Sequence, residues 1–189
     1  YATPGTIEAI FQCNALGAMD HGLFHEIHAD EGFAIADLEI SPFRISHDAA
    51  QPVAYRIENG GRSMAVATDM GCYDDYIVDN IRGSQAMVIE ANHDVNLLQV
   101  GSYPYYLKQR ILGNKGHLSN KTSGRLIDSL LENDVKKIFL GHLSKENNYD
   151  KLAFETVRLE IDMSLSEYHA KDFDISVAER ETPSQIVEI

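Results

Sequence analysis

Three short apolar segments of this chain each end at a residue that can serve as an acid, a base or a metal ligand. The segments and the residues after them are 64–68 before Asp69, 86–89 before the run 90–94, and 138–141 before His142. Short apolar runs bounded by polar residues are typical of buried strands, and sites of α/β proteins gather beyond the carboxyl ends of such strands. The pattern therefore predicts an α/β fold in which these endings meet in one crevice.

The remaining periodicity predicts an antiparallel meander followed by alternating helices and strands. A helix is expected to begin after Thr3, with Pro4 in its first turn. Strands are expected at 38–45, 53–57 and 64–68, with a turn at 59–61, and then at 86–89, 135–140 and the edge segment 173–177. Helices are expected at 74–81, 105–112, 118–131 and after residue 148. No repeat or linker divides the 189 residues, which favours a single α/β domain.

The charge of the chain is strongly acidic, with one exception. Sixteen Lys and Arg stand against 29 Asp and Glu, a formal net charge of −13, which disfavours binding of nucleic acid by bulk attraction alone. Residues 95–127 contain no acid and carry five basic residues: Lys108, Arg110, Lys115, Lys121 and Arg125. With Tyr103, Tyr105 and Tyr106, this segment is suited to holding a phosphate backbone and stacking on bases. An ordinary solvated helix face is the alternative interpretation.

Cysteine content and hydropathy restrict the compartment. Two cysteines, Cys13 and Cys72, cannot build a disulfide framework, and no apolar run approaches the roughly 18 residues of a membrane span. We therefore expect a soluble, cytoplasmic protein that has no membrane partner. The sequence makes no prediction about its oligomeric state.

The residues at the expected strand ends include ligand types that suit zinc, manganese or iron. His47 ends a fourth segment, 44–48, and joins Asp69, His93 and His142 in this set. Hydrogen-bonded structural histidines, with an aspartate that caps the next helix, are the alternative. The chain has no CxxC or HExxH metal motif, no GxSxG elbow, no P-loop and no GxGxxG fingerprint. Serine hydrolysis, P-loop chemistry and dinucleotide binding are therefore disfavoured.

Six motifs occur in order along the chain. They are ISHDAA at 45–50, ATDMG at 67–71, EANHD at 90–94, YPY at 103–105 with LKQRI at 107–111, GHLSN at 116–120 and GHLSKENN at 141–148. In order and spacing they resemble the YycJ/WalJ (VicX) family of bacterial metallo-β-lactamase-fold hydrolases over nearly the whole chain. The resemblance implies a four-layer αββα sandwich with a dinuclear metal site at one edge of its sheets. It also implies phosphodiesterase chemistry, with DNA exonuclease activity attributed to the group.

The resemblance also implies roles for particular residues. His47, Asp69 and His142 match the family's metal ligands, with Asp69 bridging the two metals. Asp69, His93 and His117 are the expected catalytic residues. The candidate substrate-binding residues are Asn92, Lys108, Arg110, Ser119, Ser144 and Asn147.

One departure from the family pattern is large. The family's principal motif, His-x-His-x-Asp-His, is absent, and His21, His25 and His28 fit neither its spacing nor its place. In the family that motif lies upstream of the part that resembles residues 1–3. We therefore expect residues 1–189 to be the C-terminal two-thirds to three-quarters of one metallo-β-lactamase-like domain, with the fold incomplete at its N-terminus.

The function expected for the intact protein is hydrolysis of phosphodiesters, DNA above all, by water activated between two divalent cations. Zn²⁺ or Mn²⁺, roughly 3.5–4 Å apart, would stabilise the attacking and leaving oxygens. Two alternatives stay open. The fold also hosts hydrolases of small esters, thioesters and lactones, and the chain could be a catalytically incomplete fragment or binding module.

Overall fold

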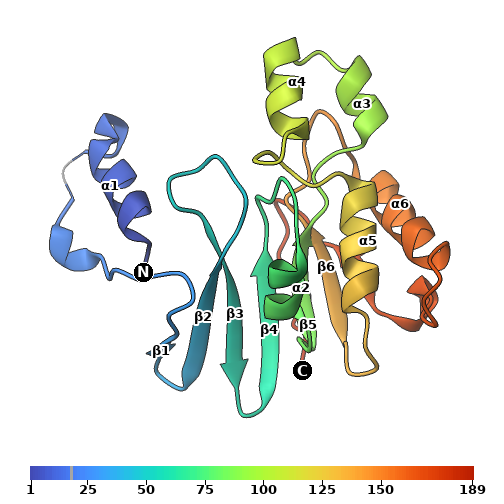
Figure 1. Ribbon diagram of the computed structural model, residues 1–189, viewed down its shortest axis with the longest axis horizontal. Helices are drawn as coiled ribbons and strands as arrows, with labels where there is room; N and C mark the ends of the chain where they lie inside the picture. Colours follow the sequence, from blue (N-terminus) through green and yellow to red (C-terminus); the bar gives the residue numbers. More distant parts are fainter. Residues whose placement is uncertain (18) are drawn as a thin grey trace.

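A computed structural model describes residues 1–17 and 19–189. These residues form a seven-stranded mixed sheet whose strands neighbour one another in the order of the sequence (Figure 1). The strands are β1 (Phe33–Ile35), β2 (Leu38–Arg44), β3 (Val53–Asn59), β4 (Arg62–Ala67), β5 (Ala86–Glu90), β6 (Lys137–Gly141) and β7 (Ile175–Val177). Pairing is antiparallel from β1 to β4 and parallel from β4 to β7. The expected meander, followed by alternating strands and helices, is confirmed.

Six α-helices and three short 3₁₀ turns accompany the sheet in the described ranges. The helices are α1 (Pro4–Gln12), α2 (Asp75–Ile81), α3 (Val95–Val100), α4 (Tyr105–Leu112), α5 (Asn120–Leu130) and α6 (Asp150–Asp162). Thr3 is the N-cap residue of α1, as expected, although its hydroxyl donates to the carbonyl of Gln51 rather than capping the helix. Strand β1 and helix α3 were not predicted, because three and six residues are too short to show a periodicity.

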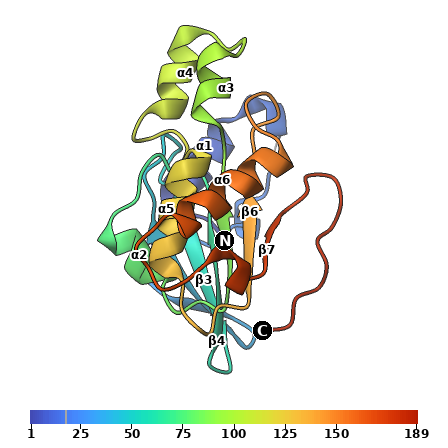
Figure 2. The same cartoon turned by 90° about the vertical axis from the view of Figure 1, so that its right-hand side faces the viewer.

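The hydrophobic core lies between one face of the sheet and the layer formed by α2, α5 and α6 (Figures 1 and 2). Successive side chains of a strand point to opposite faces, so Ala65, Met87 and Ile138 face the helices and are fully buried. Helices α5 and α6 approach closely at Gly124, where a Cβ atom would lie 2.7 Å from Cβ of Glu160. The described residues thus supply one sheet and one helical layer of the expected four-layer arrangement.

The opposite face of the sheet is covered less completely. Val66, Val88 and Phe139 alternate with the buried core residues and keep part of their surface exposed. The segment after β7 runs to the C-terminus without a further helix or strand, which agrees with the loose end expected there.

Helices α3 and α4 form an arm, residues 95–112, that projects beyond the carboxyl ends of the parallel strands (Figure 1). Asp94 starts the arm, because its side chain accepts a hydrogen bond from the N–H of Leu97 and caps α3. Within the described ranges, none of the helices has the length and hydropathy needed to cross a membrane.

Candidate metal centre and active site

Four strand endings meet at one edge of the sheet. Asp69 follows β4, Glu90 ends β5 and His142 follows β6, and these three strands are parallel. Strand β2 runs in the same direction, because it and β4 are both antiparallel to β3, so His47 arrives at the same edge. Sequence periodicity predicted this convergence, and topology supplies the reason for it.

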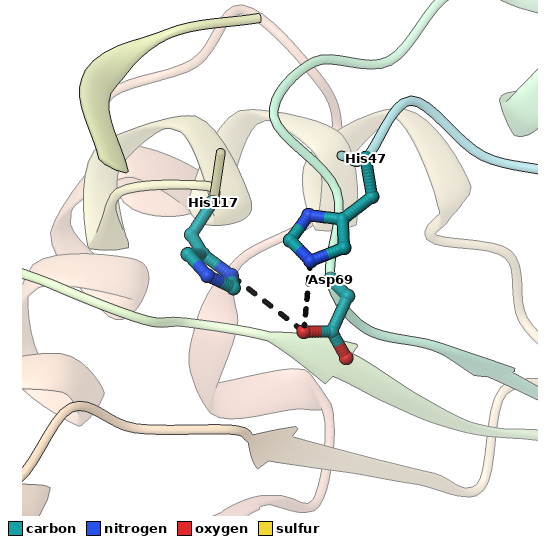
Figure 3. A group of neighbouring side chains, drawn as sticks. All are labelled: His47, Asp69 and His117. Carbon is teal, nitrogen blue, oxygen red and sulfur yellow. Dashed lines mark ion pairs between the residues drawn. The ribbon is translucent and has the colours of Figure 1, made fainter. Parts of the chain in front are cut away.

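Three histidines surround one carboxylate oxygen. Oδ1 of Asp69 lies 3.7 Å from Nε2 of His47, 3.8 Å from Nδ1 of His117 and 3.5 Å from Nε2 of His142. Figure 3 shows the rings of His47 and His117 on two sides of the Asp69 carboxylate. The three histidines come from different loops, so the tertiary fold alone brings them together.

A fully buried carboxylate lies behind this cluster. Oε1 of Glu90 is 2.7 Å from Nδ1 of His117 and 3.0 Å from Nδ1 of His142, and Oε2 accepts the N–H of Met70. Burial by itself raises the pKa of Glu90, but the hydrogen bonds from the two histidines outweigh it and lower the pKa. The same hydrogen bond raises the pKa of His142 above its ordinary value. Glu90 is therefore a buried anion that orients two rings.

The loop at 113–117 lies against the two loops that carry His47 and Asp69. The carbonyl of Gly116 is 3.0 Å from Nδ1 of His47, which leaves Nε2 of that ring facing Asp69. The hydroxyl of Ser46 donates to the carbonyl of Asn114 at 2.8 Å. Only glycine fits at position 71, since a Cβ atom there would lie 2.3 Å from the backbone of Asn114. Backbone contacts therefore set the spacing of the cluster.

Two residues of the cluster have left-handed backbone conformations. Asp69 has φ of 61° and His142 has φ of 55°, a region that is uncommon for residues other than glycine but enriched in Asp, Asn and His. Such conformations collect at functional sites, where the surrounding structure holds them in place.

The donor set fits divalent cations. Two groups each place their ligand atoms within 4.8 Å of one another: His47, Asp69 and His117 in one group, and Glu90, His117 and His142 in the other. Imidazole nitrogens and carboxylate oxygens suit zinc and manganese. The chemistry of the cluster therefore matches a site for divalent metal.

A cavity of about 950 Å³ opens beside the cluster. His117 and His142 line it, together with three of the expected substrate-binding residues: Asn92, Arg110 and Ser144. Nδ2 of Asn92 also donates to the carbonyl of His142 at 2.9 Å, so this side chain supports the loop as well as lining the cavity.

In the part of the chain that the structure describes, the other three expected substrate-binding residues do not line this cavity. Nζ of Lys108 donates to the carbonyls of Gln99 and Gly101 at 2.8 and 2.7 Å, which ties α4 to the end of α3. Ser119 is the N-cap of α5 and accepts the N–H of Thr122. Asn147 is buried in the loop before α6. These placements suit structural roles.

His93, an expected catalytic residue, has a ring that lies inside the protein. The residue is 1% exposed, and neither ring nitrogen has a hydrogen-bond partner among the described residues. Burial lowers the pKa of this imidazole to about 4. His93 is therefore neutral at physiological pH. Among the described residues, it is not one of those that line the cavity beside His117.

The acid-free segment is less basic than its sequence indicates. Arg110 forms an ion pair with Asp48, and Nε of Arg125 lies 2.9 Å from a carboxylate oxygen of Glu160. Both carboxylates come from outside the segment, so the composition of the segment does not predict these ion pairs.

Tyr149 and Arg180 are among the residues of the cavity wall that were not singled out from the sequence. Tyr149 lies beside the Ser144–Asn148 turn, and Arg180 belongs to the segment after β7. Position directly after the GHLSKENN motif was a signal for Tyr149. No local signal marks Arg180, which reaches the cavity only because the chain returns there after β7.

Comparison with known proteins places the fold. Residues 1–142 match the family model described as the beta-lactamase superfamily domain. The chain belongs to the beta-lactamase superfamily. Two solved structures support the metallo-β-lactamase fold, although at 14–16% identity they show the fold alone. Zn²⁺-bound PqqB from Methylobacterium extorquens has a TM-score of 0.60, covering 94% of this chain and 59% of that one. YhfI from Bacillus subtilis has a TM-score of 0.55, covering 82% and 52%.

Two curated relatives of this chain confirm the resemblance to the YycJ/WalJ family. Exodeoxyribonuclease WalJ of Streptococcus pneumoniae serotype 2 (strain D39 / NCTC 7466) is 40% identical over 157 residues, which cover 83% of this chain and 58% of the relative. Exodeoxyribonuclease YycJ of Bacillus anthracis is 38% identical over 144 residues, covering 72% and 54%. The chain thus spans somewhat more than half the length of these relatives.

Proposed function

We propose that this chain carries the catalytic residues of a metal-dependent phosphodiesterase that removes nucleotides from the ends of DNA. The observation that carries the proposal is the arrangement of His47, His117 and His142 around one oxygen of Asp69, beside a cavity that His117 and His142 line. The names of the relatives, both exodeoxyribonucleases, favour DNA as the substrate over small esters. A cytoplasmic location is part of the proposal, because both relatives are named as DNA-degrading enzymes and Cys13 and Cys72 are free cysteines.

We assign the metal ligands to His47, Asp69 and His142, because ring nitrogens of both histidines lie 3.7 and 3.5 Å from the Asp69 carboxylate. Two divalent cations, Zn²⁺ or Mn²⁺, are the expected complement. When bound, such cations lower the pKa of water and stabilise the charge that develops on the phosphate. Because Asp69 lies among all three histidines, its carboxylate would be the ligand common to both cations.

His117 is the proposed proton carrier. Glu90 holds Nδ1 of this ring at 2.7 Å, which fixes the tautomer and leaves Nε2 as the free nitrogen. A histidine oriented in this way can protonate the oxygen that leaves when the phosphodiester is cleaved. Glu90, which is buried, holds this ring in one orientation.

The remaining assigned residues bind substrate or support the site. Asn92, Arg110 and Ser144 line the cavity and are the candidates for contact with the DNA. Lys108, Ser119 and Asn147 hold helix ends and loops in place.

Asp69→Asn tests the proposal, because asparagine keeps the shape and tolerates the left-handed backbone but removes the charge. We expect release of nucleotides from end-labelled DNA, with Mn²⁺ or Zn²⁺ present, to fall about 10²-fold or more. Elemental analysis should show less bound metal in the variant than in the wild type. Asp79→Asn, on the surface of α2, is the control and should keep full activity. Wild-type protein that cleaves small esters but no DNA would contradict the proposal.

A further inference from the structure

The cavity beside the metal cluster is built from three separate parts of the chain. Helix α4 and the residues before it supply one wall, the loop from His142 to Asp150 supplies another, and residues 178–180 close a third. Its volume of about 950 Å³ is at the upper end of the usual range for a site that encloses a small ligand. The cavity therefore has room for a nucleotide unit but not for a double helix.

Aromatic side chains line this cavity. Tyr103 precedes α4, and Tyr149 precedes α6. Tyr149 is 56% exposed, and its side chain makes no capping hydrogen bond to α6. An exposed ring on a cavity wall offers a face on which a base can stack, and stacking of this kind is tolerant of sequence.

Cationic side chains line the same cavity. Lys145 and Arg180 have no carboxylate partner within salt-bridge distance in the described part of the chain. A guanidinium nitrogen of Arg180 donates to the carbonyl of Leu143 at 2.5 Å, which fixes this side chain at the wall. Two carboxylates, Asp150 and Glu179, also line the cavity, so its charge is mixed and its cations are localised. Localised cations beside aromatic rings are typical of surfaces that follow a single strand.

We propose that this cavity holds an unpaired nucleotide at the end of the DNA, with its base stacked on Tyr149 and its phosphate held by Lys145 and Arg180. Bases within a duplex are stacked on their neighbours, so their faces are not available to a tyrosine. The cavity thus selects a frayed or single-stranded end and presents the next phosphodiester to His117 and His142. This assignment rests on the proposed function and names the form in which its substrate enters.

Binding of a short oligonucleotide tests the assignment without catalysis. A labelled single-stranded DNA of about six nucleotides, a length within the site sizes of single-strand binders, is titrated with the 189-residue chain in EDTA and followed by fluorescence anisotropy. Tyr149→Ala should weaken binding about tenfold, and Tyr149→Phe, which keeps the ring, should bind as the wild type does. Tyr105→Ala is the matched comparison, because Tyr105 is 77% exposed on α4 and does not line the cavity as described.

The salt dependence of the same binding separates phosphate contacts from base contacts. Lys145→Gln should reduce the slope of log K against log salt by about 0.7, the value for one phosphate contact with a single strand. Tyr149→Ala should leave that slope unchanged. Lys136→Gln, exposed just before β6 and therefore at the opposite edge of the sheet, should change neither affinity nor slope.

Three results would overturn the assignment: wild-type protein that does not bind the oligonucleotide, Tyr149→Ala and Tyr105→Ala proteins of equal affinity, or a blunt duplex that binds as tightly as the single strand. These results are distinct from failure of the proposed function, which is scored by metal-dependent cleavage in the wild type and in Asp69→Asn. If cleavage depends on Asp69 but binding is indifferent to Tyr149, only the cavity assignment fails.

Discussion

Arg110 on α4 and Asp48 in the loop after β2 are joined by two hydrogen bonds, although 62 positions separate them. Nη2 of Arg110 donates to Oδ1 of Asp48 at 2.8 Å, and Nε donates to Oδ2. The N–H of Asp48 also donates to the carbonyl of Lys115 at 3.1 Å. His47 directly precedes Asp48, so this pair connects the α3–α4 arm to a proposed metal ligand.

Removal of the Arg110 guanidinium should free the Asp48 carboxyl. Hydrogen bonding to Arg110 lowers the pKa of Asp48 from 3.8 to about 2. In Arg110→Gln, a carbon-13 NMR titration should find this pKa back near its ordinary value. Because the folded-state pKa is depressed, the pair stabilises the fold above pH 3.8 and loses its effect as the pH falls towards 2. The difference in unfolding free energy between wild type and variant should shrink over that interval.

A surface pair provides the comparison for this experiment. Arg158→Gln removes a partner of Glu155 on α6, 3.6 Å away at the surface, and should leave the Asp48 titration unchanged. An Asp48 pKa that stays near 2 in Arg110→Gln would show that another group holds the carboxylate in its charged form.

A methyl group at position 71 should disrupt the candidate metal centre. In Gly71→Ala the new Cβ would meet the backbone of Asn114 at 2.3 Å and the amide nitrogen of Gly116 at 2.5 Å. Backbone atoms cannot move aside as a flexible side chain can, so we expect the free energy of unfolding to fall by about 1–3 kcal/mol. Metal content should fall as well, because the loops of His47, Asp69 and His117 would separate.

Gly32→Ala is the matched control for the Gly71 variant. Its nearest atoms would lie 3.7 and 3.9 Å from the added Cβ, which is ordinary contact. Urea unfolding and elemental analysis of both variants make the comparison. Equal stability and metal content in the two would mean that the loops are more widely spaced than the structure places them.

The buried ring of His93 should make the protein less stable in mild acid. Its pKa is lowered from 6.5 to about 4 in the folded protein, so below pH 6.5 the unfolded chain takes up a proton that the folded chain does not. Stability is therefore lost as the pH falls from 6.5 towards 4, by about 3 kcal/mol. His93→Leu should remove this part of the pH dependence, measured by urea unfolding in EDTA.

An exposed histidine is the control for the His93 measurement. His28→Leu changes a side chain that is about half exposed and should keep the pH dependence of the wild type. If His93→Leu and wild type lose stability in parallel between pH 6.5 and 4, the imidazole is protonated in the folded protein and its burial is not as described.

Local sequence was enough to predict most of the elements that build this site. Apolar runs before Asp69 and His142 indicated strands, and the Asn59-Gly60-Gly61 turn indicated the hairpin between β3 and β4. These signals are local, because a strand or a turn is encoded by neighbouring residues. Imidazole and carboxylate side chains at the strand ends indicated metal ligands, and the family motifs added the expectation of a site for two metal ions.

The side-chain contacts of the basic segment could not be predicted from its local sequence. Its composition predicted free cations, but Lys108 donates to the carbonyls of Gln99 and Gly101, and Arg110 pairs with Asp48. Arg180, a cation of the cavity wall, lies far from that segment in sequence. The contacts of a long charged side chain depend on which surfaces meet in space, and neighbouring residues do not carry that information.

The sequence by itself determined strands β2 to β7, their order of appearance and the ligand types at their ends, because periodicity and residue chemistry are properties of short stretches. Only the tertiary structure decided which of those residues act together. It placed Glu90 behind His117 and His142, turned His93 into the interior, and brought Tyr149 and Arg180 to one cavity. The physical reason is that strand direction and loop packing, set by contacts between residues far apart in the chain, determine where each side chain points.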